Sequence, residues 1–137
     1  MFYVLNTHLD NRSESARRRA ATQLASFLAR LDPALPRIVT GDFNAPAQAG
    51  TSVYDTMLSQ GGLVDSWYRA AKRSEHYGTW HGYEQPVPGG ARIDWILTSP
   101  DIVTEYAAIN AYCDQGQYPS DHLPVQAVLT LPPPGRL

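Results

Sequence analysis

The sequence predicts a mixed α/β (α+β) fold, with a mixed, mainly antiparallel sheet and one long helix on its outer face. Three observations favour this class: strand-like segments begin the chain and fill its C-terminal third, and one long amphipathic segment follows the first strand. The strands expected at 2–9 and 92–98 are apolar in both alternating sets, so both of their faces need cover. A single long helix covers one face only, so we expect another layer.

The N-terminal elements are clearly marked. Residues 2–9 are rich in aromatic and β-branched residues and predict a strand. Asn11 is a candidate N-cap, with Glu14 at the spacing of a capping box, for a helix that runs to about Leu31. The Asp-Pro pair at 32–33 ends this helix, because the residue before a proline is disfavoured in the α conformation.

The remaining elements are shorter. A strand is expected at 37–40, broken by Gly41 and followed by a loop over 41–50. The pattern then predicts short helices at 51–60 and 63–72, a long loop at 74–91 with a short strand at 79–83, strands at 92–98, 102–112 and 124–131, and a flexible tail at 132–137.

Composition excludes several classes of protein. The 137 residues suit one domain, and no apolar run reaches the ~18–20 residues of a membrane span. The N-terminal sequence lacks the features of a signal peptide, so a cytoplasmic location is expected. Cys113 is the only cysteine, which excludes an internal disulfide and a cysteine-based zinc site. The net charge of −2 disfavours a basic nucleic-acid domain, although a bound metal can supply local positive charge.

Polar clusters stand at the expected strand ends. Asn6 and His8 share one face of the first strand, since side chains alternate. Asp42 and Asn44 are two residues apart and reach one cleft if the chain stays extended there. Asp94 lies within an apolar strand, where an unpaired carboxylate is costly, so it pairs with Arg92 or serves function.

The fourth cluster is Asp121-His122, whose side chains diverge because they are neighbours in an extended segment. Taken singly, each cluster has an ordinary structural explanation, such as a turn or a helix cap. Together they offer carboxylates, a carboxamide and two imidazoles. These groups favour Mg²⁺-assisted attack of water on a phosphate ester, with an imidazole held protonated by a carboxylate.

Four segments then carry a family resemblance. NTHLD (6–10), GDFNA (41–45), RIDWILTS (92–99) and PSDHLPV (119–125) resemble, in order and rough spacing, the last four motifs of the endonuclease/exonuclease/phosphatase superfamily. This superfamily includes DNase I, exonuclease III and sphingomyelinases, and the closest likeness is to bacterial members described only as metal-dependent hydrolases. The resemblance implies a phosphodiesterase, nuclease or phosphatase that uses Mg²⁺, with Mn²⁺ as the alternative.

The resemblance also implies roles for individual residues. His8 would contact the scissile phosphate, and Asp42 would orient or deprotonate the attacking water. His122 would stabilise the transition state, oriented by a hydrogen bond to Asp94. Asn44 would hold the phosphate or a metal-bound water. The implied metal ligands are Asp121, Asp42 and Asn44.

The chain matches only the C-terminal half of such a domain. The family domain is about twice as long, and its first half supplies an Asn and the principal metal-binding Glu. The resemblance therefore implies that residues 1–131 form half of a four-layer α/β/β/α sandwich. We expect a homodimer or a complementing N-terminal half to cover the open sheet.

Three alternatives stay open at this stage. The chain can be a non-catalytic half-domain that acts through a partner chain. A zinc hydrolase would use His8, His76, His81 and His122, but no HxH or HExxH pair occurs. The substrate is either a nucleic acid or a small phosphorylated molecule, and the aromatic residues Tyr77, Trp80 and Tyr83 can stack on a base, an inositol or a sugar, or pack the loop onto the body.

Overall fold

A computed structural model describes residues 1–133. Its elements in chain order are β1 (Tyr3–His8), α1 (Glu14–Leu28), β2 (Arg37–Asp42), α2 (Ser52–Ser59), β3 (Val64–Asp65), α3 (Ser66–Arg69), β4 (Lys72–Arg73), β5 (Asp94–Thr98), β6 (Val103–Ile109) and β7 (Val125–Thr130). The mixed α+β class is confirmed. Of the predicted tail at 132–137, residues 134–137 lie outside the described part.

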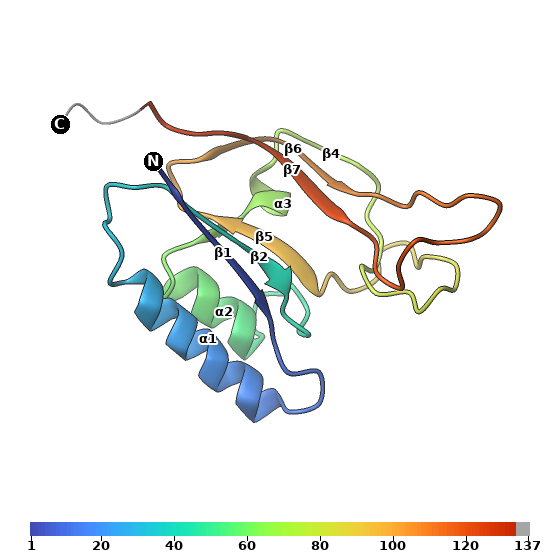
Figure 1. The fold of residues 1–137 in the computed structure, drawn as a ribbon, viewed down its shortest axis with the longest axis horizontal. Coiled ribbons are helices and arrows are strands. Elements are labelled where there is room, and N and C mark those ends of the chain that lie inside the picture. The colour runs from blue at the N-terminus through green and yellow to red at the C-terminus, as the bar shows by residue number, and fades with distance from the viewer. Residues whose placement is uncertain (134–137) are drawn as a thin grey trace.

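The strands form two sheets. The first has the order β1-β2-β5-β3, with β1 and β2 parallel and the other pairs antiparallel. The second has the order β4-β6-β7. Helices α1 and α2 cover one face of the first sheet, and the second sheet and α3 lie on its other side (Figure 1). The second layer that the two-sided strands require is therefore supplied partly by this chain itself.

The core between the first sheet and its helices is built from large apolar side chains. Phe43 stacks on Trp95 with ring centroids 4.0 Å apart, and Tyr54 meets Trp95 edge-on. Leu28 from α1 and Met57 from α2 are fully buried in the same cluster. This packing holds the two central strands β2 and β5 rigidly, which matters because their ends carry the polar clusters.

The start of α1 differs from the expectation. Ser13, not Asn11, is the N-cap: its hydroxyl accepts from the Ala16 N–H at 3.2 Å. The Asp10 carboxylate accepts hydrogen bonds from the N–H groups of Arg12 and Ser13 in a turn before the helix. The capping box was wrong because a serine two residues further on competes better for the first free N–H groups, and the helix ends at Leu28 rather than Leu31.

Strand β2 continues through Gly41 to Asp42, where a break was expected. Gly41 has φ 152°, and a side chain there would overlap the carbonyl of Thr7 on the neighbouring strand. Glycine thus permits the close approach of β1 and β2 at this point. The consequence is functional, since the unbroken strand places Asp42 in register with both His8 and Asp94.

The segment 63–72 was expected as a helix and instead holds β3, the one-turn α3 and β4. Asp65 pairs with Leu97 of β5, and its carboxylate then caps α3 by accepting from the Trp67 N–H at 2.9 Å. Pairing with distant strands overrides the local helical pattern. The predicted strand at 79–83 is also absent from the described structure, where a single bridge joins Trp80 to His122.

Candidate active site

The polar clusters of three strands meet at one end of the first sheet. His8 ends β1, Asp42 ends β2 and Asp94 begins β5. Asp42 is the register partner of His8 on one side and of Asp94 on the other. The loop carrying His122 reaches the same place through its bridge to Trp80. The structure thus brings together four of the predicted site residues.

His122 and Asp94 form the closest pair in the site. The imidazole Nδ1 lies 2.8 Å from the Asp94 Oδ2, and Nε2 lies 3.9 Å from the Asp42 Oδ2. A carboxylate beside Nδ1 favours the proton on that nitrogen, so Asp94 fixes both the tautomer and the direction of the ring. Of the two possibilities that the sequence left open for Asp94, the structure shows the pairing with His122 and not the one with Arg92.

The surroundings of His122 favour its charged form. Burial acts to lower the pKa of the imidazole, but the hydrogen bond and charge of Asp94, with the charges of Asp42 and Asp121, outweigh burial. The net effect is a pKa raised above the usual value for histidine. An imidazolium at this position can donate a hydrogen bond to an anion in front of Nε2.

His8 is the exposed wall of the site. Its side chain is 73% exposed, and its Nε2 lies 3.3 Å from the Asp42 Oδ2, whereas the Asp42 side chain is only 14% exposed. Asp42 therefore has an imidazole on each side. An exposed imidazole beside a half-buried carboxylate can contact an anion that enters from solvent.

The chain turns sharply between Asp42 and Asn44 instead of staying extended. Asn44 has φ 47°, and its backbone N–H donates to the Asp42 Oδ1 at 2.8 Å. Its side-chain nitrogen donates to the Leu9 carbonyl at 2.9 Å. The turn therefore fixes the Asp42 carboxylate, and it leaves the Asn44 amide oxygen to accept a hydrogen bond or to ligate a metal.

Asp121 stands beside this cluster. Its backbone carbonyl accepts from the N–H groups of His81 and Gly82, and its charge acts on the pKa of His122. The group whose ligand atoms lie within 4.8 Å of one another is Asp42, Asp94 and His122. Among the predicted ligands, only Asp42 belongs to that group.

Thr79 is a site residue that sequence reasoning missed. Its side chain is fully buried, and its Oγ1 accepts from the N–H groups of Ile93 and Asp94 at 2.9 and 3.1 Å. Its carbonyl accepts from the Leu123 N–H at 2.7 Å. Thr79 thus ties the residues on either side of the His122–Asp94 pair together. No spacing rule connects it to Asp94, fifteen residues on.

We expect Thr79→Val to lower the free energy of unfolding by about 1–3 kcal/mol, because two partly buried N–H groups lose their acceptor while the shape is kept. Thr79→Ser retains the hydroxyl and is expected to lose much less. Urea unfolding of the 137-residue chain followed by circular dichroism measures both. A loss in Thr79→Ser with Thr79→Val as stable as the parent would instead assign the contribution of Thr79 to its methyl group.

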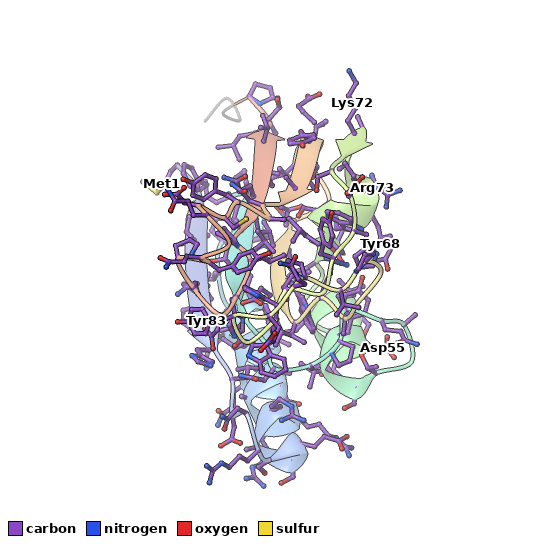
Figure 2. The ribbon with its side chains drawn as sticks, turned by 90° about the vertical axis from the view of Figure 1, so that its right-hand side faces the viewer. Met1, Asp55, Tyr68, Lys72, Arg73 and Tyr83 are labelled. Carbon is purple, nitrogen blue, oxygen red and sulfur yellow. The ribbon has the colours of Figure 1, made fainter. Side chains whose placement is uncertain are left out.

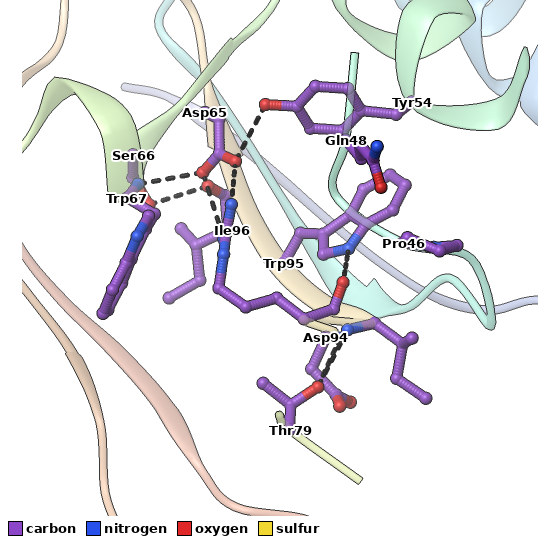
Figure 3. A network of polar contacts seen from close by, with 12 residues as sticks. Pro46, Gln48, Tyr54, Asp65, Ser66, Trp67, Thr79, Asp94, Trp95 and Ile96 are labelled. Atoms are coloured by element: carbon purple, nitrogen blue, oxygen red, sulfur yellow. Dashed lines mark hydrogen bonds and ion pairs between the residues drawn. The ribbon is translucent and has the colours of Figure 1, made fainter. Parts of the chain in front are cut away.

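Arg92 pairs with an acidic residue other than Asp94. Its guanidinium lies 2.6 Å from the Asp65 carboxylate, with both side chains almost completely buried. Asp65 also accepts from the Tyr54 hydroxyl and the Trp67 N–H, and the Trp95 Nε1 donates to the Arg92 carbonyl (Figure 3). This network lies directly before Asp94 and fixes the backbone that carries it.

The other histidines do not join the cluster. Both ring nitrogens of His81 lie near backbone carbonyls, Glu84 at 2.7 Å and Ser120 at 3.1 Å. His76 packs against the ring of Trp67. Within residues 1–133, the one group suited to a metal contains a single histidine, which disfavours the zinc-hydrolase alternative. In the same range, no helix is long and apolar enough to cross a membrane.

Comparison with known proteins identifies the class. The model of the Endonuclease/Exonuclease/phosphatase family matches residues 2–122, and this span contains His8, Asp42, Asp94 and His122. The chain belongs to this family, as its four motifs implied. No curated protein matches the sequence significantly.

Solved structures add particular relatives. The mannosyl-6-phosphatase of Bacteroides thetaiotaomicron VPI-5482 is 30% identical, with a TM-score of 0.79 over 93% of this chain and 51% of that chain. An endonuclease/exonuclease/phosphatase family protein from Bacteroides thetaiotaomicron is 28% identical, with a TM-score of 0.81 over 94% and 49%. Sphingomyelinase C from Streptomyces griseocarneus is 19% identical with a TM-score of 0.64 over 90% and 51%, which shows the fold alone. The chain spans about half the length of these structures.

Proposed function

We propose that the chain is the C-terminal half of a divalent-metal-dependent hydrolase of phosphate esters, in which water attacks phosphorus. The observation that carries the proposal is the His122–Asp94 pair, whose free Nε2 faces the Asp42 carboxylate within the family-matched span. The pair supplies a cation at a fixed position, and Asp42 supplies an acceptor for a proton of water.

Each residue of the chain then has a defined task. His122, oriented by Asp94, donates to an oxygen of the phosphate as negative charge develops there. His8, exposed at the rim, contacts another phosphate oxygen. Asp42 orients or deprotonates the water, and Asn44 holds the phosphate or a metal-bound water through its amide oxygen.

The donor set fits a hard divalent cation. Asp42 brings a carboxylate oxygen to the cluster, Asn44 lies in the turn that directly follows it, and Asp121 stands beside His122. We propose Asp42, Asp121 and Asn44 as the ligands of a Mg²⁺ ion, with Mn²⁺ as the alternative, because these metals prefer oxygen donors. The ion would supply positive charge for the phosphate and lower the pKa of bound water. Asp94 is excluded from the set because it already holds His122.

A small phosphorylated molecule is the favoured substrate class. The phosphatase relative at 30% identity supports a monoester, and the net charge of −2 disfavours long duplex nucleic acid. The run Arg17-Arg18-Arg19 lies on the first half of α1, and the Arg17 guanidinium donates to the Asp10 carbonyl. This contact gives one of the three arginines a structural task outside the site.

The partner we propose is a complementing N-terminal half of the same domain, with a second copy of the chain as the alternative. Strand β1 is an edge strand in this structure; Phe2 just before it and Val4 within it are 46% and 60% exposed. The relatives are about twice as long as this chain. The alternative, a non-catalytic half-domain, needs the same partner but predicts that the complex hydrolyses no phosphate ester.

The test is complementation. We expect the 137-residue chain alone to release little phosphate from mannose 6-phosphate, and the chain mixed with the N-terminal half of the Bacteroides relative to release it readily. Chelation of divalent ions should abolish that activity, and Mg²⁺ rather than Zn²⁺ should restore it. Activity with Zn²⁺ but not Mg²⁺ would overturn the metal assignment. A complex that forms without hydrolysing mono- or diesters would favour the non-catalytic alternative.

A further inference from the structure

Trp80 is unusually exposed for a residue next to the candidate site. It is 59% exposed, whereas the other two tryptophans, Trp67 and Trp95, are 6% and 0% exposed. Leaving a large apolar ring in water forgoes a considerable burial free energy. The indole packs into neither of the two core clusters, so packing of the core does not explain a tryptophan at this position.

The backbone places Trp80 beside His122 of the candidate site. Trp80 and His122 are opposite one another in an antiparallel bridge. The Leu123 N–H donates to the Thr79 carbonyl and the His81 N–H to the Asp121 carbonyl, so the hydrogen bonds flank the pair rather than join it. In such a non-hydrogen-bonded pair the two side chains leave the same face with Cα atoms ~4.5 Å apart. The indole therefore starts beside the imidazole of His122.

The loop around Trp80 is held firmly. The neighbouring His81 is buried, with its ring nitrogens near two backbone carbonyls. Gly82, with φ 61°, packs so close to the indole that an added Cβ would lie 3.3 Å from Cζ2 of Trp80. An exposed ring fixed by its backbone loses little conformational entropy when a ligand stacks on it.

The charges nearby select among ligands with a flat face. The segments 74–91 and 110–123, which supply Trp80 and His122, contain no Lys or Arg and carry four acidic residues: Glu75, Glu84, Asp114 and Asp121. A site for single-stranded nucleic acid combines stacking rings with a positively charged groove. A neutral ring with one phosphate needs no such groove, because its single charged group sits at His122 and the metal.

We propose that Trp80 is the stacking wall for the ring of a sugar phosphate, with the C–H face of the pyranose on the indole and the phosphate at His122. The inference rests on the proposed function and specifies its substrate class. The negative face of an indole attracts the weakly positive C–H bonds of a sugar ring. The neighbouring aromatic residues differ: Tyr77 donates to Glu75, and Tyr83 lies further along the loop at the face seen in Figure 2.

The test compares ligands of equal charge with and without a ring. Because Trp80 is the exposed tryptophan, acrylamide quenching of fluorescence reports on it. With Mg²⁺ present, we expect glucose or mannose 6-phosphate to protect Trp80 from acrylamide, and glycerol 3-phosphate and inorganic phosphate to protect it weakly. By calorimetry, Trp80→Leu should weaken hexose 6-phosphate binding roughly tenfold and leave glycerol 3-phosphate unchanged. Tyr83→Leu, the matched control, should change neither.

Each failure has its own reading. Equal weakening of the ring and acyclic esters in Trp80→Leu would make Trp80 a structural residue and overturn the stacking, while the hydrolase proposal stands. Protection of Trp80 from acrylamide that increases with protein concentration and does not depend on ligand would overturn the stacking proposal, and would show that Trp80 lies in a contact between chains. Absence of binding of any phosphate, inorganic phosphate included, to the complemented protein would overturn the proposed function itself. Ring-selective binding without hydrolysis after complementation would support the stacking and contradict catalysis.

Discussion

Replacing His122 with alanine is expected to abolish hydrolysis by the complemented protein, with a fall in kcat of about 10²–10⁴-fold. The variant removes the cation that faces the phosphate and leaves Asp94 as an unpaired carboxylate at the same place. Since the proposed mechanism has the imidazole act on charge that develops during the reaction, the loss should appear in kcat with a smaller change in KM. Steady-state kinetics on a phosphate monoester measure both constants.

Two companion variants separate chemistry from folding. His76→Ala removes an imidazole that packs on Trp67 outside the site and should leave kcat within a few-fold of the parent. Asp94→Asn keeps the shape of the pair but loses the charge that helps to raise the pKa of His122, so kcat should fall while the protein stays folded. Unchanged activity in His122→Ala would contradict the mechanism, whatever the other variants do.

The centre of this site could be predicted from the sequence because strands place their ends reliably. His8, Asp42 and Asp94 each stand at the end of a segment whose composition marks it as a strand, and the sheet brings those ends into register. His122 followed from its motif rather than from any periodicity. Family membership of residues 2–122 was predictable on the same four motifs.

The parts that escaped prediction depend on contacts distant in sequence. Thr79 acts on Asp94 through a buried hydroxyl, and Asp65 meets Arg92 across twenty-seven residues. Residues 63–72 have a helical pattern, yet pairing of Asp65 with β5 and burial of Trp67 impose strand and a single turn of helix. Local propensity is a weak prior wherever tertiary pairing satisfies the backbone better.

Turn chemistry explains the remaining differences. Asn44 adopts a left-handed conformation that asparagine tolerates, and the turn folds its N–H onto Asp42. An extended chain would have carried both side chains to one face. The turn holds the Asp42 carboxylate in one orientation and leaves the amide oxygen of Asn44 without a protein donor in the turn. Both residues therefore stay in the proposed site, but their side chains do not lie on one face.

Replacing Asp65 with alanine is expected to cost about 3–5 kcal/mol of unfolding free energy, the largest stability effect we predict. The side chains of Arg92 and Asp65 are 4% and 2% exposed, so the variant leaves an uncompensated guanidinium in the interior. The Tyr54 hydroxyl and the Trp67 N–H lose their acceptor as well. For a chain of 137 residues, this corresponds to a fall in Tm of roughly 10–17 °C. Thermal and urea unfolding measure the change.

The double variant Asp65→Leu/Arg92→Met decides what the pair does. Replacing both charges with apolar side chains removes the desolvation cost, so its stability should recover most of the loss. Asp101→Ala, at an exposed aspartate, should cost less than about 0.5 kcal/mol. The Arg92 carbonyl accepts from the N–H of Ala47 and from Nε1 of Trp95. Arg92 lies two residues before Asp94, and Trp95 directly follows it. If the recovered double variant also keeps its hydrolytic rate, the ion pair stabilises the fold alone; a stable protein with a reduced rate would show that Arg92 and Asp65 position Asp94.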